Sequence, residues 1–306
     1  MPSISIISPN YNGERWLGNC LDSVASQTLA QEEIEMILVD DGSLDKSTDI
    51  AKEYKSHIPG LKLVQAEHTG RPGELRNRAL DMAIGRYVLF LDSDDYLGEE
   101  SLGRLSEFAS ENEPDVLAFQ LEGLDRNVPK SMLQETIENA DLVESGLYKT
   151  LGTWKMCRTE YLNDNSIRFS NLPRGEDTLF FAEAMLRAKK LSILSGYPFY
   201  TVRGREDGSS ITQKEWNNEA RISLASRMAA LTISLAFSEN IANHFLIRVF
   251  NTDAVGVLKS SNARTQDLTN LRSSLKPYWS DDVKKLIYTD ENRDILTNFL
   301  EGSRNG

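Results

Sequence analysis

In the segment VLFLDSDDY at residues 88–96, the most informative of the sequence, an apolar run of β-forming residues ends in three carboxylates within four positions. Such a run can form a buried parallel strand whose acids emerge at its carboxyl end, where open α/β sheets bind ligands. Asp92 and Asp94 can both turn toward one divalent cation, and their hard oxygen ligands suit Mg²⁺ or Mn²⁺. The same acids could instead form a turn that caps a helix starting near Glu99.

Strand and helix signals alternate on both sides of this segment. Apolar β-rich runs lie at residues 3–8, 34–39, 61–65, 87–91 and 115–120. Helical spacing of apolar residues occurs at residues 14–27, 45–54, 73–84, 99–110 and 176–189. Residues 153–158 are expected to be extended, residues 192–200 to form interrupted strands, and residues 121–141 to form a loop. Strands separated by helices predict βαβ units and a mostly parallel α/β sheet flanked by helices.

The character of the chain changes near residue 215, where glycine and proline become scarce and helical spacing dominates. Helices are expected at residues 220–237, 241–258, 266–275 and 281–299. We therefore predict a catalytic α/β domain at residues 1–215 and a smaller all-helical region at residues 216–306. The helices could pack on the first domain or on another subunit, so a homo-oligomer through this region is one expectation.

Composition excludes several classes of protein. The formal net charge of −12 over 306 residues argues against a general nucleic-acid binder, which would carry a basic footprint. Cys20 and Cys157 are too few for a disulfide framework and are expected to be buried. There is no apolar run of bilayer length and no signal-type start, so we expect a cytoplasmic protein, with peripheral association at the inner face of the membrane left open.

Two more strand ends carry polar motifs. Residues 8–12 read SPNYN, whose backbone could hold a planar base on which Tyr11 could stack; the alternative is a turn with a buried tyrosine. Residues 40–43 read DDGS and offer carboxylates to base N–H or ribose hydroxyl groups; the alternative is an Asx turn that caps the next helix.

These motifs occur in the order found in family 2 glycosyltransferases of the GT-A (Rossmann-like) fold, which residues 1–215 resemble. The resemblance implies a nucleotide-diphospho-sugar donor and a divalent cation, Mn²⁺ or Mg²⁺. It also implies that Pro9, Tyr11 and Asp41 hold the nucleoside. In the segment at residues 90–96, it implies that Asp94 binds the metal while Asp92 lies nearer the ribose or sugar, with Ser93 between them also at the donor.

Residues 68–77 read HTGRPGELRN, where glycine allows close backbone approach and arginine can neutralise phosphate. Arg76 and Asn77 match family positions near the donor, so the resemblance implies that they contact it. Arg71 could equally be a solvated loop charge. His68 is expected to be a loop residue and not a catalyst.

Residues 173–181 read PRGEDTLFF. The resemblance implies that Asp177 is the base of an inverting transfer and that its neighbour Glu176 belongs to the donor site. A carboxylate is suited to accept the proton of the attacking hydroxyl. The alternative is an acidic pair that only caps a helix, as the helix dipole favours.

Residues 202–210 read VRGREDGSS, where many relatives of the family have a histidine and this chain has none. Asp207 could substitute for it, or Arg205 could stabilise the leaving diphosphate. The alternative is a glycine-rich lid with solvated charges.

The expected function is an inverting transfer of a sugar, N-acetylglucosamine being favoured, from a UDP-sugar to an acceptor hydroxyl. The chain is similar to bacterial enzymes that attach N-acetylglucosamine to the polyol-phosphate chains of wall teichoic acid. A polyanionic acceptor of this kind needs a cationic groove, for which Arg126, Lys130, Arg168 and Arg174 are candidates, although the net charge of −12 opposes it. Two alternatives remain, a UDP-sugar-binding protein without transferase activity and a nucleotidyltransferase that makes nucleotide-sugars.

Overall fold

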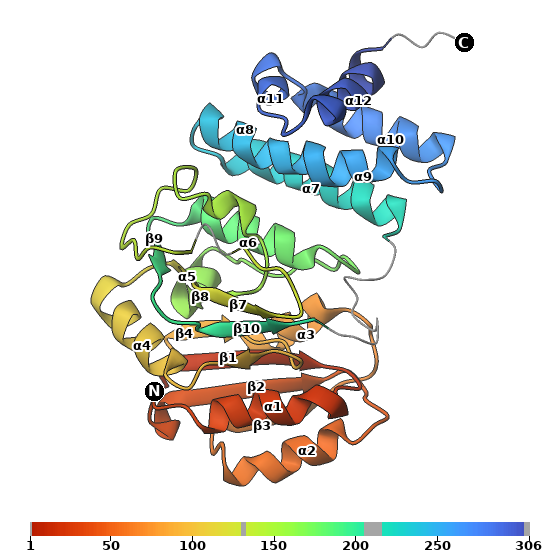
Figure 1. Ribbon diagram of the computed structural model, residues 1–306. Helices are drawn as coiled ribbons and strands as arrows, with labels where there is room; N and C mark the ends of the chain where they lie inside the picture. The colour runs from red at the N-terminus through yellow and green to blue at the C-terminus, as the bar shows by residue number, and fades with distance from the viewer. Residues whose placement is uncertain (1, 130–132, 205–215, 303–306) are drawn as a thin grey trace.

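A seven-stranded sheet forms the centre of the protein in the computed structural model, which describes residues 2–129, 133–204 and 216–302 (Figure 1). In spatial order its strands are β3 (Leu61–Gln65), β2 (Ile34–Asp40), β1 (Ile4–Asn10), β4 (Tyr87–Phe90), β8 (Lys155–Arg158), β6 (Val116–Phe119) and β9 (Leu191–Leu194). All neighbouring strands are parallel except β8, which runs antiparallel to both β4 and β6. The predicted mostly parallel α/β sheet is confirmed.

Apolar strand residues and strand register place the motifs of the sequence at one edge of this sheet. Every residue of β2 and β4 is buried, as expected for strands covered on both faces. Asn10 at the end of β1 is level with Asp40 at the end of β2, and Ile7 of β1 is level with Phe90 of β4. The polar residues that follow β1, β2 and β4 therefore emerge along the same carboxyl edge.

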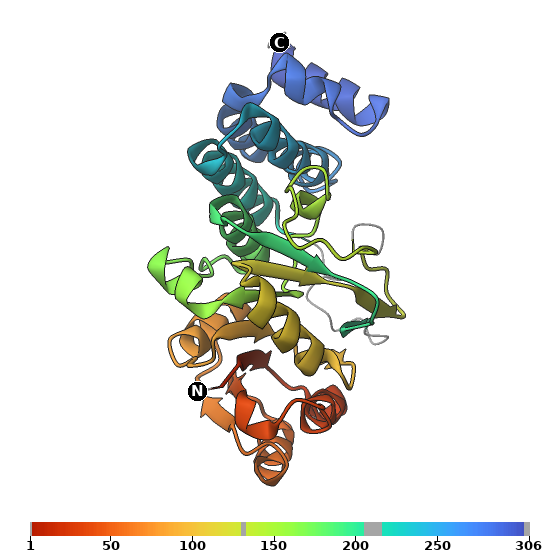
Figure 2. The same cartoon turned by 90° about the vertical axis from the view of Figure 1, so that its left-hand side faces the viewer.

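Six helices accompany the described strands. They are α1 (Glu14–Ala25), α2 (Ser47–Glu53), α3 (Pro72–Leu80), α4 (Ser101–Asn112), α5 (Thr159–Asp164) and α6 (Glu176–Arg187). Helices α1 and α2 lie on one side of the sheet and α3 on the other (Figure 2). Short α5 was not predicted.

A second sheet of three strands was also missed. It consists of β5 (Tyr96–Leu97), β10 (Tyr200–Arg203) and β7 (Leu121–Leu124), in that order. The prediction of a loop over 121–141 was therefore wrong at its start. Strand β7 exists because it pairs with β10, about eighty residues later in the chain, and local sequence carries no sign of that partner.

The part of the chain described after residue 215 is helical, as predicted. Its elements are α7 (Asn218–Leu235), α8 (Glu239–Arg248), a π-helical segment (Val249–Ala254), α9 (Val255–Leu258), α10 (Thr265–Leu275), α11 (Asp281–Lys285) and α12 (Asp290–Glu301). The prediction of one helix over 281–299 was wrong, because the chain leaves the helix after Lys285 and Thr289 caps a new one by accepting a hydrogen bond from the Asn292 N–H. The division at residue 215 stays a prediction.

This helical region lies at the end of the molecule opposite the N-terminus, and α6 lies between it and the large sheet (Figures 1 and 2). Helix α7 packs against α6 and α10. Cys20 and Cys157 are free and buried, as expected. Within the described residues, no helix is long and apolar enough to cross a membrane.

Candidate active site

The ends of β1 and β2 are tied together by Asp40. Its carboxylate accepts hydrogen bonds from the Asn10 side-chain amide (2.9 Å) and from the Ser43 N–H (2.9 Å) and hydroxyl (2.6 Å). These bonds close the turn that follows β2. They do not form the Asx turn that was expected as an alternative to cap the next helix, because the bonded N–H lies three residues on and α2 begins only at Ser47. Pro9, next to Asn10, is only partly buried and reaches the edge of the sheet.

The second acid of that motif, Asp41, holds a loop that comes from β3. One carboxylate oxygen accepts from the Thr69 N–H (2.8 Å) and hydroxyl (3.0 Å), and the other accepts from the Gly70 N–H (2.9 Å). The residue is 2% exposed. These bonds give Asp41 a role in shaping the loop, while its predicted contact with a nucleoside stays a prediction.

Tyr11 is part of an aromatic pair. Its ring stacks on the imidazole of His68, with centroids 4.1 Å apart and planes 24° apart. Tyr11 is 41% exposed, so the alternative of a buried tyrosine is wrong. His68 thus covers one face of the Tyr11 ring, and stacking of a base on Tyr11 stays a prediction. His68 is a loop residue, as expected.

The carboxylates after β4 have different environments. Asp92 is partly exposed, while Asp95 is buried and accepts hydrogen bonds from the Tyr200 hydroxyl (2.8 Å) and the Arg203 N–H (2.7 Å). Burial raises the pKa of Asp95 well above its ordinary value, and the negative charges of Asp94 and Asp92 add to the rise. Three carboxylates with different burial therefore lie close together at this strand end.

Arg76 joins this strand end to the start of α6. One guanidinium nitrogen donates to Asp92 and another donates to Glu176, each at 2.8 Å. Arg76 is 5% exposed, and the charges of Asp92 and Glu176 raise its pKa against the effect of burial. Arg76 thus gathers the two carboxylates on one guanidinium, while its predicted contact with the donor stays a prediction.

Asn77, the next residue, fixes the loop before α6. Its side-chain amide donates to the Phe169 carbonyl and accepts from the Phe169 N–H, each at 2.8 Å. Asn77 therefore fixes the backbone of the loop at Phe169. Its predicted contact with the donor stays a prediction. Gly73 permits this packing, since a Cβ there would lie 2.8 Å from Glu176 Cγ and 3.0 Å from the Ser170 carbonyl.

Helix α6 begins with the predicted acidic pair. Gly175 precedes it in the left-handed region (φ 79°), and Glu176 is buried against Arg76. Burial and the charge of Asp177 raise the pKa of Glu176, while Arg76 opposes the rise. Asp177 is partly exposed and accepts a 2.7 Å hydrogen bond from the Thr178 N–H. The pair thus divides into one inward and one outward carboxylate.

The chemistry of the strand end fits a divalent cation. Within residues 2–129, 133–204 and 216–302, no group of three or more His, Cys, Asp or Glu side chains is arranged as a metal site. Asp92 and Asp94 nevertheless supply hard oxygen donors where like charges already raise a neighbouring pKa, and a cation would relieve that repulsion.

Other predicted residues divide between described and undescribed parts of the chain. Arg205, Asp207 and Lys130 lie outside the described residues. Arg174 lies over the ring of Trp216, 4.3 Å from its centroid, and Arg126 lies 5.8 Å from the centroid of Trp154.

Arg168 is committed elsewhere, because its guanidinium donates to Asn163 (2.9 Å), Asp81 (3.3 Å) and the Ile167 carbonyl (2.9 Å). Ser93 is buried beside Gly13, where an added Cβ would lie 3.5 Å from the serine hydroxyl oxygen.

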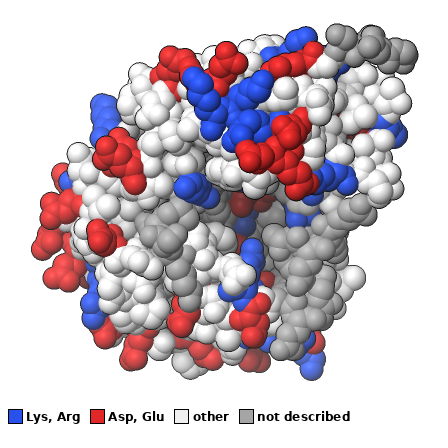
Figure 3. Space-filling view, turned by 45° about the horizontal axis from the view of Figure 1, so that its top comes forward, with Lys and Arg blue, Asp and Glu red and all other residues white. Residues whose placement is uncertain are grey.

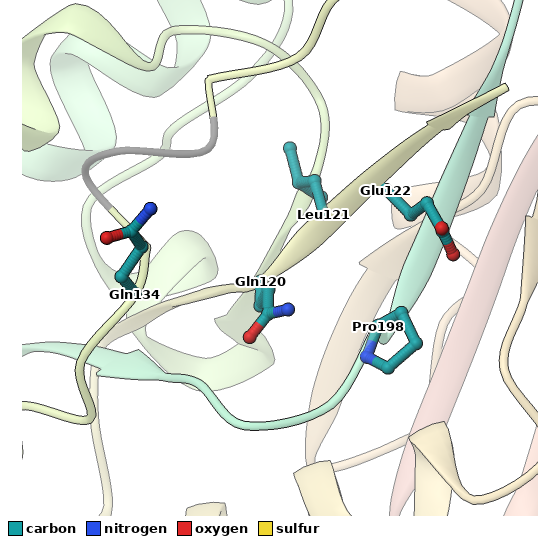
Figure 4. A pocket seen from close by; sticks show the side chains of 5 residues that line it. All are labelled: Gln120, Leu121, Glu122, Gln134 and Pro198. Atoms are coloured by element: carbon teal, nitrogen blue, oxygen red, sulfur yellow. The ribbon is translucent and has the colours of Figure 1, made fainter.

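Charges of both signs lie together on one face of the molecule. Figure 3 shows Lys and Arg side chains gathered with Asp and Glu over the upper part of one face, above a hollow. A cavity of about 320 Å³ lies elsewhere, at the start of β7, lined by Gln120, Leu121, Glu122, Gln134 and Pro198 (Figure 4). None of the predicted site residues lines this cavity, so it is separate from the carboxyl edge.

Two buried residues near the site were not predicted. Tyr200 donates to Asp95 and accepts from the Asp92 N–H (3.1 Å), which links the second sheet to the strand end. Lys155 is 1% exposed, donates to the Gly152 carbonyl (3.1 Å) and lies 4.7 Å from the Phe181 ring centroid. The apolar context of Lys155 in the strand at 153–158 was a signal of burial that could have identified it.

Comparisons with known proteins decide the family. The sequence profile described as Glycosyl transferase family 2 matches residues 5–190. The chain belongs to this family. Its fold is the GT-A fold, as expected from the motifs, and the structure of Staphylococcus aureus TarS 1–349 in complex with UDP-GlcNAc superposes with a TM-score of 0.85 at 29% identity. That match covers 98% of this chain and 91% of the other.

Curated relatives act on poly(ribitol phosphate) by name. A poly(ribitol-phosphate) beta-glucosyltransferase of Bacillus spizizenii is 41% identical over 206 residues, which are 66% of this chain and 32% of the relative. The Staphylococcus aureus enzyme TarS, a poly(ribitol-phosphate) beta-N-acetylglucosaminyltransferase, is 36% identical over 257 residues, which are 82% of this chain and 45% of TarS. The chain thus spans less than half the length of these two relatives. A mannosyltransferase from Pyrobaculum calidifontis shares the fold at 13% identity and a TM-score of 0.58.

Proposed function

We propose that this protein transfers N-acetylglucosamine from UDP-N-acetylglucosamine to a hydroxyl of a polyol-phosphate polymer, with inversion at the anomeric carbon. The observation that carries the proposal is the Arg76 bridge, which holds the donor-side carboxylate Asp92 and the base-side carboxylate Glu176 on one guanidinium. Similarity to poly(ribitol-phosphate) glycosyltransferases supports the donor and acceptor classes.

In the proposed reaction Asp177 accepts the proton of the acceptor hydroxyl as that oxygen attacks the anomeric carbon. Attack from the face opposite the leaving UDP inverts the configuration. Glu176 is the weaker candidate for the base, because its carboxylate is buried and paired with Arg76. Asp177 is partly exposed and can meet an acceptor.

The donor would lie along the carboxyl edge of β1, β2 and β4. Tyr11, together with His68, would stack on the base, beside Pro9 and Asp41, and Asp92 and Ser93 would lie near the ribose or sugar. Asp94 would hold a divalent cation, Mn²⁺ or Mg²⁺, whose charge offsets the negative charge of the diphosphate. Arg205 stays a proposal for stabilising the leaving group.

The acceptor would approach from the side of α6. Arg126 and Arg174 remain candidates for contact with its phosphates, together with Lys130. Arg168 is less suited, because its guanidinium already bonds to Asp81 and Asn163. A cytoplasmic location, peripheral association with the membrane and self-association through the helical region stay predictions.

Replacing Asp177 with asparagine tests the base. Asp177→Asn should abolish transfer and leave the affinity for UDP nearly unchanged, because the amide keeps the shape of the carboxylate and cannot take the proton. Transfer is followed with UDP-[¹⁴C]GlcNAc and UDP affinity by calorimetry. Asp164→Asn, at an exposed position on α5, is the matched control. Near-normal turnover of Asp177→Asn would remove the residue from this role.

The substrates are tested with the unmodified protein. Labelled donor is incubated with purified poly(ribitol phosphate), poly(glycerol phosphate) or lipid-linked sugar, before and after chelation and restoration of Mn²⁺ or Mg²⁺. Label in either polyol-phosphate polymer is expected, with loss on chelation. Label only in a different acceptor contradicts the acceptor class. UDP binding without any transfer favours a silent binding protein. Release of pyrophosphate when UTP and N-acetylglucosamine 1-phosphate replace the labelled donor favours a nucleotidyltransferase.

A further inference from the structure

The helical region contacts the proposed catalytic helix at a specific place. Arg248, the last residue of α8, donates a hydrogen bond from Nη2 to the hydroxyl of Thr178 at 3.1 Å. Thr178 lies in the first turn of α6 and directly follows the proposed base, Asp177. Helix α6 and the helical region are neighbours in both ribbon views (Figures 1 and 2). This bond therefore reaches across 70 residues to the residue beside the base.

The chemistry of the hydroxyl makes this contact directional. A guanidinium can only donate, so the Thr178 oxygen must accept from Arg248, and its own proton is left to point elsewhere. Asp177 Oδ1 lies 3.4 Å from that oxygen and also accepts from the Thr178 N–H at 2.7 Å. Thr178 is 5% exposed, so water does not compete freely for the hydroxyl. Oδ1 of Asp177 therefore accepts a short bond from the Thr178 N–H and lies within longer reach of the hydroxyl of the same residue.

Arg248 lies near a buried carboxylate, that of Asp253. Asp253, 4% exposed, lies in the π-helical segment Val249–Ala254 that follows α8. Burial raises the pKa of Asp253 to about 6, and the positive charges of Arg248 and Arg221 oppose that rise. The Arg221 guanidinium fits against Gly256, where a Cβ would lie 1.7 Å from Nη1. π-Helical turns are uncommon and often occur at functional sites.

We propose that Arg248 is a positioning residue for the transfer reaction, which orients the Asp177 carboxylate through the Thr178 hydroxyl. The inference rests on the proposed function, since it assumes that Asp177 is the base. This role would give the helical region a part in catalysis. The α/β domain supplies the Asp177 carboxylate, and α8 supplies the Arg248 guanidinium that orients the neighbouring Thr178 hydroxyl.

The test is a double-mutant cycle on Arg248 and Thr178. Arg248→Ala and Thr178→Val should each lower kcat for transfer from UDP-GlcNAc to poly(ribitol phosphate) by about ten- to a hundredfold, as small misplacements of a catalytic group do. The KM for UDP-GlcNAc and the calorimetric affinity for UDP should stay within about twofold, because neither side chain is proposed to contact the donor. The double variant should lose no more than the single variants, since both break the same chain of contacts.

Conservative variants separate positioning from simple support of the fold. Thr178→Ser keeps the hydroxyl and should restore most of kcat, and Arg248→Lys should restore part of it. Arg227→Ala removes the same charge from an exposed position on α7 and should behave as the unmodified protein. If Arg248→Ala unfolds at the assay temperature, the test is the comparison of kcat between Thr178→Val and Thr178→Ser.

Three results would overturn the inference: unchanged kcat in Thr178→Val, additive losses in the double variant, or an equal loss of UDP affinity. Asp177→Asn is measured in parallel. If it retains transfer, the proposed base is wrong and the inference is overturned with it. If it is inactive while Thr178→Val and Arg248→Ala turn over normally, only the positioning role is refuted.

Discussion

Replacing Arg76 with methionine should remove the guanidinium group that lies between Asp92 and Glu176 and should destabilise the folded protein. The two ion pairs differ in burial, since the Glu176 side chain is 9% exposed and the Asp92 side chain is 31% exposed. Removing one partner of a buried ion pair costs about 3–5 kcal/mol, because it leaves an uncompensated charge. We expect about 3 kcal/mol, the lower end of that range, because solvent reaches Asp92.

The decrease in the free energy of unfolding caused by Arg76→Met should be larger at neutral than at acidic pH. Arg76 lowers the pKa of Glu176, which burial and Asp177 raise above its ordinary value of 4.5. Without Arg76 that pKa rises further, so the folded protein binds a proton more readily than the unfolded chain. A carboxyl group whose pKa is raised by folding lowers the free energy of unfolding as the pH rises through its pKa in the folded protein. Below its pKa in the unfolded chain, it has no destabilising effect. The difference from the unmodified protein should therefore be largest near neutral pH and shrink toward pH 4.5.

Urea unfolding at both pH values measures this difference. The control is Arg187→Met, which removes an arginine from a pair with Glu183 on the surface of the same helix, α6. That pair is partly exposed and should be worth no more than about 0.5 kcal/mol. If Arg76→Met costs no more than Arg187→Met, or if its cost grows as the pH falls, the bridge does not hold the site together as described.

Two further changes test the surroundings of the site. Burial lowers the pKa of Lys155 to about 7, so the unfolded chain binds a proton that the folded protein releases, and stability should rise between pH 7 and 10.5. Lys155→Met should flatten that rise in urea unfolding, and an unchanged slope would contradict the burial of a titrating amine. Gly175→Ala should lower stability by about 1–3 kcal/mol, because φ is 79° and the new Cβ would lie 2.6 Å from Leu224 Cδ2. In thermal unfolding Gly18→Ala, which meets nothing within 4 Å on α1, should not destabilise, and equal melting of the two variants would refute the strain at Gly175.

Local sequence predicted the fold well where the apolar pattern within a segment is enough to identify it as a strand or a helix. The bounds of β3, a partly exposed edge strand, were predicted to the residue. Those of β1, β2 and β4 were predicted to within a few residues, because buried parallel strands are written as continuous apolar runs. Prediction failed where pairing decides the structure. Strands β5 and β7 are short and depend on β10, and the antiparallel direction of β8 has no local signal.

The site was predicted as a set of residues but not as a set of contacts. The strand-end pattern indicated that the acids would share one edge, and the structure gathers Asp92, Arg76 and Glu176 there. The partners of Asp41 and Asn77 lie 28 and 92 residues away, so their commitment to the Thr69 and Phe169 backbones could not be read from either motif. Thr178 and Arg248 were missed for the same reason.

The reversed strand β8 also bears on how the chain is made. It pairs on one side with β4 and on the other with β6, so it is the strand that joins the two halves of the large sheet. A nascent chain that has emerged from the ribosome only as far as β6 can assemble β1 to β4, yet β4 then presents an open edge. Open edges invite pairing with other chains. Once residues 155–158 have also emerged, β8 covers the open edge of β4 and joins β6 to the sheet, while β6 keeps an open edge until β9 (Leu191–Leu194) follows.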